Sequence, residues 1–289
     1  MRRSERLLRQ IAEDHRSGAT ALTRRAGEAL LAFLKEHPGA SPEELGRFAE
    51  GLVEAQPAMA SIRNLAQRAV RARERGGPAA AETAVRAFLE ELARSPVEIA
   101  ERALPLIPRG ARVLTISFSA TVFEALRRAH EAGKGIAVVC PESRPLREGL
   151  RLARELAALG VPVEVCVDAL APSLVGECDL VLVGGDALAP EGLVNKCGTY
   201  PLALAASSER KPFVALISER KLLERFEPGW ARRAMPPDEV LEAPLEGVRV
   251  RNAYFDLTPL ARISTVVTER GAFRPEADRE ALRRRLRSS

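Results

Sequence analysis

The first third of the chain has apolar side chains that recur every three or four residues. Leu45, Phe48 and Leu52 show this spacing, and the same period continues from residue 3 to about 104. Such a period places apolar groups along one side of a helix. The pattern therefore predicts an all-helical domain over residues 1–108.

Two local signals divide this helical region. Ser41 followed by Pro42 and Glu44 has the composition of a capping box, with proline at the first helical position. Gly76 and Gly77 lie within an otherwise helical pattern and predict a break between two helices.

From residue 112 onwards, short apolar runs alternate with amphipathic segments of 10 to 15 residues. The expected strands are 113–116, 136–140, 163–167, 180–183 and 213–217, with further strands at 248–250 and 263–267. The expected helices are 120–132, 145–159, a short one before 180, 199–209 and a closing helix at 275–287, with 218–247 read as loop. Strands that alternate with helices predict βαβ units with right-handed crossovers. We therefore assign the α/β class, with a Rossmann-like parallel-sheet domain over residues 109–289 that holds a ligand pocket and an oligomer interface.

Composition narrows the cellular setting. The chain has 289 residues, of which 46% are hydrophobic and only 4% aromatic, which suits helices packed on a parallel sheet. No apolar run approaches the length of a membrane span, and the start MRRSERLLRQ lacks the apolar region of a signal peptide. These features indicate a cytoplasmic protein without a membrane partner.

The charge and the metal-binding residue types exclude other classes. The net charge is +5, and basic residues alternate with acidic ones instead of interleaving with aromatics, so direct nucleic-acid binding is not expected. The four cysteines and three histidines do not occur at metal-ligand spacing. We expect buried, reduced thiols, no metal site and no cofactor.

Polar side chains follow four of the expected strands. Ser117 and Ser119 follow the first strand, 142–144 the second, Asp168 the third, and 184–186 the fourth. In an open parallel sheet, ligands bind outside the carboxyl ends of the strands. The pattern predicts a site at that edge, although Ser119 is also suited to cap the helix that follows it.

The segment 184–198 is expected to be a glycine-punctuated loop with most of the site's chemistry. Gly184 and Gly185 allow close backbone approach to a ligand, and Lys196 lies beside a helix N-terminus that favours an anion. Asn195 lies next to it, and Asp186 has the chemistry of a general acid or base.

Arg144 is suited to a second phosphate or a carboxylate. Alternatives stay open: Asp186 or Asn195 as turn caps, and Lys196 or Arg144 as solvated or ion-paired surface groups. Glu148 fits an exposed helix charge.

Several motifs resemble one family. The central block is VLVGGDALAPEGLVNKCGTYPLALAA, and the others are LTISFSATV, VVCPESRPLREGLRLARELAALGVPVEVCVDA, FDLTPLARISTVVTERG, SGATALTRRAGEALLAFL and QPAMASIRNLAQRAV. They are similar to the family that joins the alpha, beta and delta subunits of translation initiation factor 2B with 5-methylthioribose-1-phosphate isomerase and ribose-1,5-bisphosphate isomerase. The resemblance covers nearly the whole chain in order.

The resemblance implies roles for particular residues. The isomerases use as a catalytic pair an aspartate, present here as Asp186, and a cysteine, whose position is occupied by Ser117. A serine hydroxyl is a much weaker acid than a thiol. An arginine of the isomerases is Gln56 here, and a glutamine of theirs is Glu148, whose charge would repel a phosphate.

The substitutions leave Arg144, Asn195 and Lys196 as the phosphate-facing residues that the resemblance implies.

Three functions are consistent with these residues and with the resemblance. The first is an initiation factor 2B-like regulatory protein that binds a sugar phosphate or nucleotide. The second is an aldose–ketose isomerase acting on a pentose 1-phosphate. The third is an interaction module with an unused pocket.

The family also implies a homo-oligomer, a dimer or a hexamer, formed through the C-terminal domain. Within this chain, FDLTPLARISTVV has more apolar side chains than a small terminal segment needs for its own burial. The alternative is that these side chains fill the sheet's own core.

Overall fold

The computed structural model describes residues 1–14, 17–226, 229 and 233–287. The chain forms two compact units. The first unit comprises Met1–Ser95 with Arg220–Leu222, and the second comprises Pro96–Glu219 with Leu223–Ser289. Each unit is described below by itself.

The first unit is helical, as the apolar period predicts. Its helices are α1 (Arg3–Glu13), α2 (Ala19–Glu36), α3 (Pro42–Ala55) and the part of α4 (Ala60–Ala103) that precedes residue 96. The Ser41 hydroxyl accepts the Glu44 N–H while the Glu44 carboxylate accepts the Ser41 N–H, so the capping box forms. α4 is interrupted at Gly76 and Gly77, and Gly77 has a φ of 73°, which favours glycine.

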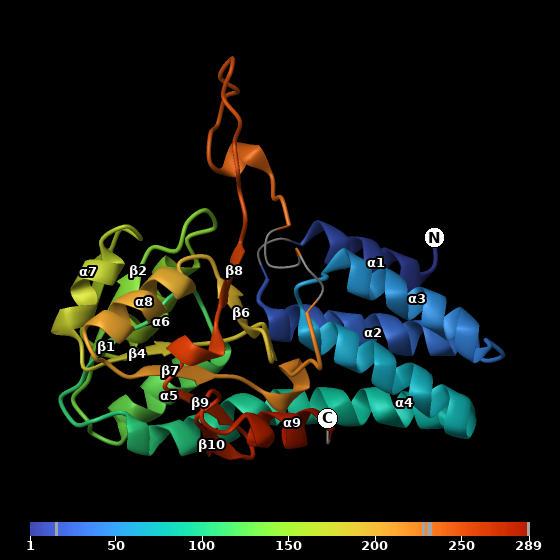
Figure 1. The fold of residues 1–289 in the computed structure, drawn as a ribbon. Coiled ribbons are helices and arrows are strands. Elements are labelled where there is room, and N and C mark those ends of the chain that lie inside the picture. The colour runs from blue at the N-terminus through green and yellow to red at the C-terminus, as the bar shows by residue number, and fades with distance from the viewer. Residues whose placement is uncertain (15–16, 227–228, 230–232, 288–289) are drawn as a thin grey trace. The chain divides into compact units, whose positions relative to one another are not determined.

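The second unit contains a seven-stranded sheet with the order β10-β9-β7-β4-β1-β2-β3 (Figure 1). Its strands are β1 (Arg112–Leu114), β2 (Ala137–Pro141), β3 (Val163–Cys166), β4 (Leu180–Val183), β7 (Phe213–Leu216), β9 (Thr265–Thr268) and β10 (Gly271–Phe273). All neighbouring pairs are parallel except β9 with β10. The parallel sheet and the α/β class are confirmed.

Helices cover both faces of this sheet. The end of α4, α5 (Ala120–Glu131) and α6 (Glu148–Ala158) pack on one face, in a core that includes Leu180 and Leu182 of β4. The intervening Val181 and Val183 are also buried, which places them on the face where α8 (Thr199–Ser208) packs, next to the short α7 (Ala171–Leu174). Because both faces are covered, the central strands are apolar throughout.

A second, three-stranded sheet was not predicted. β5 (Ala187–Ala189), β6 (Gly192–Lys196) and β8 (Phe255–Thr258) are antiparallel in the order β5-β6-β8. The interpretation of 184–198 as one loop was therefore wrong. A Cβ on Gly192 would lie 2.3 Å from a backbone oxygen of β8, so only glycine allows β6 to begin so close to β8.

Four other expectations can be compared with the fold. The predicted strand at 248–250 is wrong, because these residues belong to neither sheet. The strand expected at 263–267 is β9, and the closing helix is α9 (Arg279–Arg287). Within the described part of 218–247 lie the short helices η3 (Glu219–Lys221) and η5 (Pro237–Glu239), otherwise mostly loop.

Burial corrects the argument drawn from FDLTPLARISTVV. Leu260, Ile263 and Val266 are at most 5% exposed, so they fill the core of the second unit. Leu257, at 38% exposure, is the large apolar side chain of this segment that remains at the surface. The segment by itself therefore gives no support to an oligomer interface.

Cys140, Cys166 and Cys178 are buried free thiols, as expected, whereas Cys197 is exposed. Among the described residues, no helix is long and apolar enough to cross a membrane.

Candidate functional site

Three loops at the carboxyl ends of β1, β2 and β3 are joined by hydrogen bonds. The Ser117 N–H donates to the Ser143 hydroxyl over 2.8 Å. The carboxylate of Asp168 accepts the N–H groups of Ser143 and Arg144, at 2.7 and 2.6 Å. Asp168 and Ser143 therefore fix the position of Ser117, the residue at the family's thiol position.

Backbone strain gathers in the same loops. Ser117, Ser143 and Arg147 have φ values of 63°, 65° and 58°, in the region that side chains other than glycine rarely adopt. Each such residue costs on the order of 1 kcal/mol or more and persists only where its surroundings hold it. Such strain is common at ligand sites, which supports the prediction of a site at this sheet edge.

Lys196 is buried and paired. Its ammonium donates to both carboxylate oxygens of Glu148, over 2.9 and 2.8 Å, and the two side chains are 4% and 22% exposed. The nitrogen also lies 5.5 Å from the centre of the Tyr254 ring. Lys196 belongs to strand β6 and Glu148 begins α6. Because the Glu148 side chain is mostly buried against Lys196, the expectation of an exposed Glu148 was wrong.

Asp256 occupies the N-terminus of α8. Its carboxylate accepts the N–H groups of Gly198 and Tyr200, over 2.7 and 3.1 Å. Burial raises the pKa of Asp256 to about 6, against the opposing effect of these hydrogen bonds. The N-terminus of α8, where a ligand anion was expected, is therefore already occupied by the carboxylate of Asp256 from β8.

Asn195 is buried next to the same turn. Its amide donates to the Thr199 hydroxyl over 3.0 Å, and that hydroxyl donates to the Lys196 carbonyl. This arrangement stabilises the connection from β6 to α8, in agreement with the alternative of Asn195 as a turn residue.

Gly184 and Gly185 are required by space. A Cβ on Gly184 would lie 2.6 Å from the Ser119 hydroxyl, and one on Gly185 would lie 2.7 Å from Ile217. Ser119 itself caps α5 through the Val122 N–H. The half-buried Asp186 follows the two glycines, and its N–H donates to a carbonyl of β6 over 2.9 Å.

Arg144 is exposed, and its guanidinium donates to the Glu239 carbonyl over 3.2 Å. The Glu239 carboxylate in turn accepts from the Asn252 amide and the Tyr254 hydroxyl. Burial and this carboxylate both raise the pKa of Tyr254. Residues 239–254 therefore connect Arg144 with the ring that faces Lys196.

Gln56, at the position of an isomerase arginine, has a structural role in the first unit. Its amide donates to the Ile11 and Asp14 carbonyls at the end of α1, over 2.8 and 3.0 Å.

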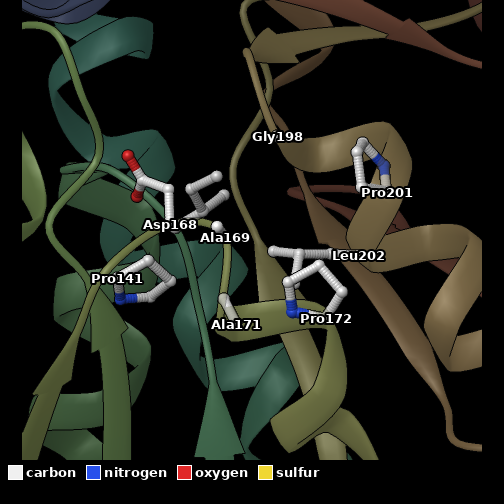
Figure 2. Close-up of a pocket in the computed structure, with 9 residues that line it drawn as sticks. Pro141, Asp168, Ala169, Ala171, Pro172, Gly198, Pro201 and Leu202 are labelled. Carbon is white, nitrogen blue, oxygen red and sulfur yellow. The ribbon is translucent and has the colours of Figure 1, made fainter.

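A pocket of about 250 Å³ lies between α7, α8 and the strand ends (Figure 2). Asp168 is on one side and Pro201 and Leu202 of α8 are on the other. The lining is mostly apolar and includes none of the seven residues predicted for catalysis or phosphate binding. Among the described residues, no group of three or more metal-ligating side chains occurs.

Four of the seven predicted residues fall into two groups, Ser117 with Arg144 around Asp168, and Asn195 with Lys196 around the start of α8. The other three, Gly184, Gly185 and Asp186, form the connection from β4 to β5. Sequence reasoning missed Asp256, Glu239 and Tyr254. Their partners lie between 13 and 95 residues away, so no local spacing marks them.

The fold and the strand-end groups define a two-part α/β protein with a Rossmann-like parallel sheet and its polar edge. The model of the Initiation factor 2 subunit family matches residues 15–275, and the chain belongs to this family.

Its relatives include two kinds of protein. A putative translation initiation factor eIF-2B subunit 2-like protein of Pyrococcus horikoshii is 32% identical, over 94% of this chain and 96% of the relative. The ribose 1,5-bisphosphate isomerase of Archaeoglobus fulgidus is 30% identical, over 90% and 86%. The crystal structure of the translation initiation factor eIF-2B of P. horikoshii has a TM-score of 0.82 at 31% identity, covering 96% of this chain and 98% of that one.

Proposed function

We propose that this protein is an initiation factor 2B-like regulatory protein that does not turn over a sugar phosphate. A phosphorylated sugar or nucleotide that enters the site acts on it as an effector. The proposal rests on the ion pair between Lys196 and Glu148.

The ion pair neutralises the cation that would hold a phosphate. Both Glu148 oxygens contact the Lys196 nitrogen, and Lys196 is almost fully buried. Buried charges are costly to separate from their partners. A phosphate can contact Lys196 only by displacing Glu148, which lowers its affinity and links its binding to movement at the start of α6.

The residues at the positions of the isomerases' catalytic pair also support the regulatory proposal. Ser117 replaces the isomerase thiol, and its hydroxyl is a poor proton donor or acceptor at neutral pH. Asp186 alone retains the chemistry of the catalytic pair. A site with one of two catalytic groups and a neutralised phosphate contact suits ligand binding better than turnover.

The second candidate is an isomerase acting on a pentose 1-phosphate. Asp186, Asn195 and Lys196 are present in the expected order, and one relative is named as a ribose 1,5-bisphosphate isomerase. In this case Asp186 moves protons on the ring-opened sugar, with Ser117 or water in place of the thiol.

Turnover of ribose 1,5-bisphosphate and 5-methylthioribose 1-phosphate separates the two. The samples are wild type, Ser117→Cys, Glu148→Gln and the double variant. Wild type should show no turnover, and Glu148→Gln should bind the sugar phosphates at least tenfold more tightly, about 1.4 kcal/mol, because Lys196 is released. The double variant should gain turnover because it has both isomerase groups.

Asp186→Asn in the double-variant background is the control, because it removes the remaining catalytic group and should abolish any gained turnover. Wild-type turnover on the order of 1 to 1000 per second would overturn the regulatory proposal. An unchanged affinity in Glu148→Gln would show that the ion pair does not control the phosphate contact.

A further inference from the structure

The pocket between α7 and α8 lies where open parallel sheets bind ligands. Ile116 follows β1, Pro141 ends β2 and Asp168 follows β3, and all three line the pocket. Ligands of such sheets bind outside the carboxyl ends of the strands. Ser117 and Arg144 follow the same strands but are not part of the lining. The same edge of the sheet therefore offers a second place for a ligand.

The lining of this pocket is apolar except for one carboxylate. Ile116, Pro141, Ala171 and Leu202 are its buried members, whereas Ala169 is exposed. Water beside such side chains finds few hydrogen-bond partners, so an apolar group that displaces this water gains affinity. The inner part of the pocket therefore suits an apolar group of a ligand.

Most of the side chains in the lining cannot change shape. Three prolines, two alanines and one glycine make up six of its nine residues, and these residue types lose no side-chain rotamers when they are covered. A pocket formed before its ligand arrives binds at a lower entropic cost. Its volume of about 250 Å³ is below the roughly 300–1,000 Å³ of pockets for drug-sized molecules, so it admits a ligand of one or two rings.

The carboxylate of the lining belongs to Asp168, and it has no counter-ion within the described part of the chain. Its oxygens accept the backbone N–H groups of Ser143 and Arg144, and the Arg144 guanidinium donates instead to the Glu239 carbonyl. A carboxylate accepts about four hydrogen bonds, so Asp168 can take further donors. In Figure 2 this carboxylate lies at the opposite end of the pocket from Pro172. A ligand with an apolar body and a donor at one end matches this arrangement.

A second carboxylate makes the surroundings of the pocket more negative. Gly198, which is part of the lining, donates its N–H to Asp256 over 2.7 Å. Burial raises the pKa of the adjacent Cys197 thiol, and the charges of Asp256 and Asp168 raise it further, against the opposing charge of Lys196. Charge complementarity therefore favours a cationic ligand over an anionic one.

We propose that this pocket is a binding site for a small apolar ring that carries a protonated amine. The ring lies among the prolines, and the amine donates to Asp168. The pocket includes none of the residues predicted for phosphate, so the proposal goes beyond the proposed function and does not depend on it.

The amine binds to the group that organises the strand-end loops. Asp168 holds the N–H groups of Ser143 and Arg144, and the Ser143 hydroxyl accepts the Ser117 N–H. A ligand on Asp168 therefore stabilises the observed positions of these loops. The protein gains a means of regulation that is separate from the phosphate contact of Lys196.

Three compounds that share an indole ring and a short side chain separate the effect of the ring from that of the charge. Tryptamine is a cation, tryptophol is neutral and indole-3-propionate is an anion. Each is titrated into the full chain at neutral pH and followed by saturation-transfer NMR. Tryptamine should bind with a Kd on the order of 1 mM or below, and at least tenfold more tightly than indole-3-propionate, with tryptophol in between. Absence of saturable tryptamine binding, or equal affinity for the anion, would overturn the proposal.

Two variants locate the bound compound. Ala169→Phe fills the pocket from its exposed rim and should weaken tryptamine binding at least tenfold, whereas Ala158→Phe, at the exposed end of α6, should leave it unchanged. Asp168→Asn should remove the preference for tryptamine over tryptophol, because only the charge of the lining is lost. Circular dichroism checks that each variant is folded. Tryptamine binding that survives Ala169→Phe, or a preference for it that persists in Asp168→Asn, would contradict the assigned site.

Discussion

Replacing Glu148 with Gln should destabilise the fold more than replacing Lys196 with Met. The two side chains are 22% and 4% exposed, so the group left behind differs in its access to water. Loss of Glu148 leaves an ammonium in a nearly dry position, whereas loss of Lys196 leaves a carboxylate that water can reach.

The magnitudes follow from the geometry. Removing one partner of a buried ion pair costs about 3–5 kcal/mol. The amide oxygen of the introduced glutamine can still accept one hydrogen bond from Lys196, so we expect about 2–3 kcal/mol for Glu148→Gln, at or just below the lower limit of that range. For Lys196→Met we expect about 1–2 kcal/mol, because the remaining carboxylate is partly solvated.

Urea unfolding followed by circular dichroism measures both costs and that of the double variant. The double variant should cost at least about 1 kcal/mol less than the two single costs added together, because neither charge is left unpaired. Equal single costs that add without coupling would refute the reasoning. Stabilisation by inorganic phosphate is a second measurement. At a concentration 100 times its Kd for Glu148→Gln, phosphate should stabilise that variant by about 2.7 kcal/mol. The same phosphate concentration should stabilise wild type much less.

Three further results are expected. Folding raises the pKa of Asp256 from 3.8 to about 6, so between these pH values the folded state binds more protons than the unfolded chain. The free energy of unfolding of wild type should therefore fall as pH increases from about 4 to about 6. Measured by urea unfolding across this range, it should depend less on pH in Asp256→Asn. Gly149→Ala places a Cβ 1.8 Å from a backbone oxygen of β2 and should lower the free energy of unfolding by about 3 kcal/mol or more in thermal unfolding. As its control, Gly46→Ala in α3 places a Cβ with no atom within 4 Å and should raise the free energy of unfolding by about 0.5–1 kcal/mol. Ser143→Ala removes the acceptor of the Ser117 N–H at a buried position and should lower the free energy of unfolding by about 1–3 kcal/mol in thermal unfolding.

The helical region and the parallel sheet were predictable because their signals are local. Helix period and capping at Ser41 depend on residues within a few positions of one another, and apolar strands between amphipathic helices leave few possible topologies. The β5–β6 hairpin was not predicted because β5 has only three residues, all apolar, and shows no alternation of apolar and polar side chains. A strand of that length cannot be told from loop without its neighbours.

The position of two of the candidate residues in the fold was predictable, but the side-chain pairing around them was not. The strand-end rule placed Ser117 and Arg144 after the first two strands of the parallel sheet, and they follow β1 and β2, whereas Lys196 was expected on a loop and lies on β6 of the second sheet. The partner of Lys196 is 48 residues away on α6, and the acid at the start of α8 is 58 residues from Gly198. These contacts depend on how α6 and β8 are positioned against β6, which follows from packing of the whole unit.

The pair of Lys196 with Glu148 joins two kinds of backbone. Lys196 lies on β6, which is bonded to β5 on one side and β8 on the other, so its position is fixed by the central strand of a sheet. Glu148 is the first residue of α6, and its partner is a side chain on that strand. A glutamate codon becomes a glutamine codon through one nucleotide, without any change to the strands. The charge offered to a ligand can therefore be reset during evolution by one helical residue, while the frame that holds the lysine is inherited unchanged.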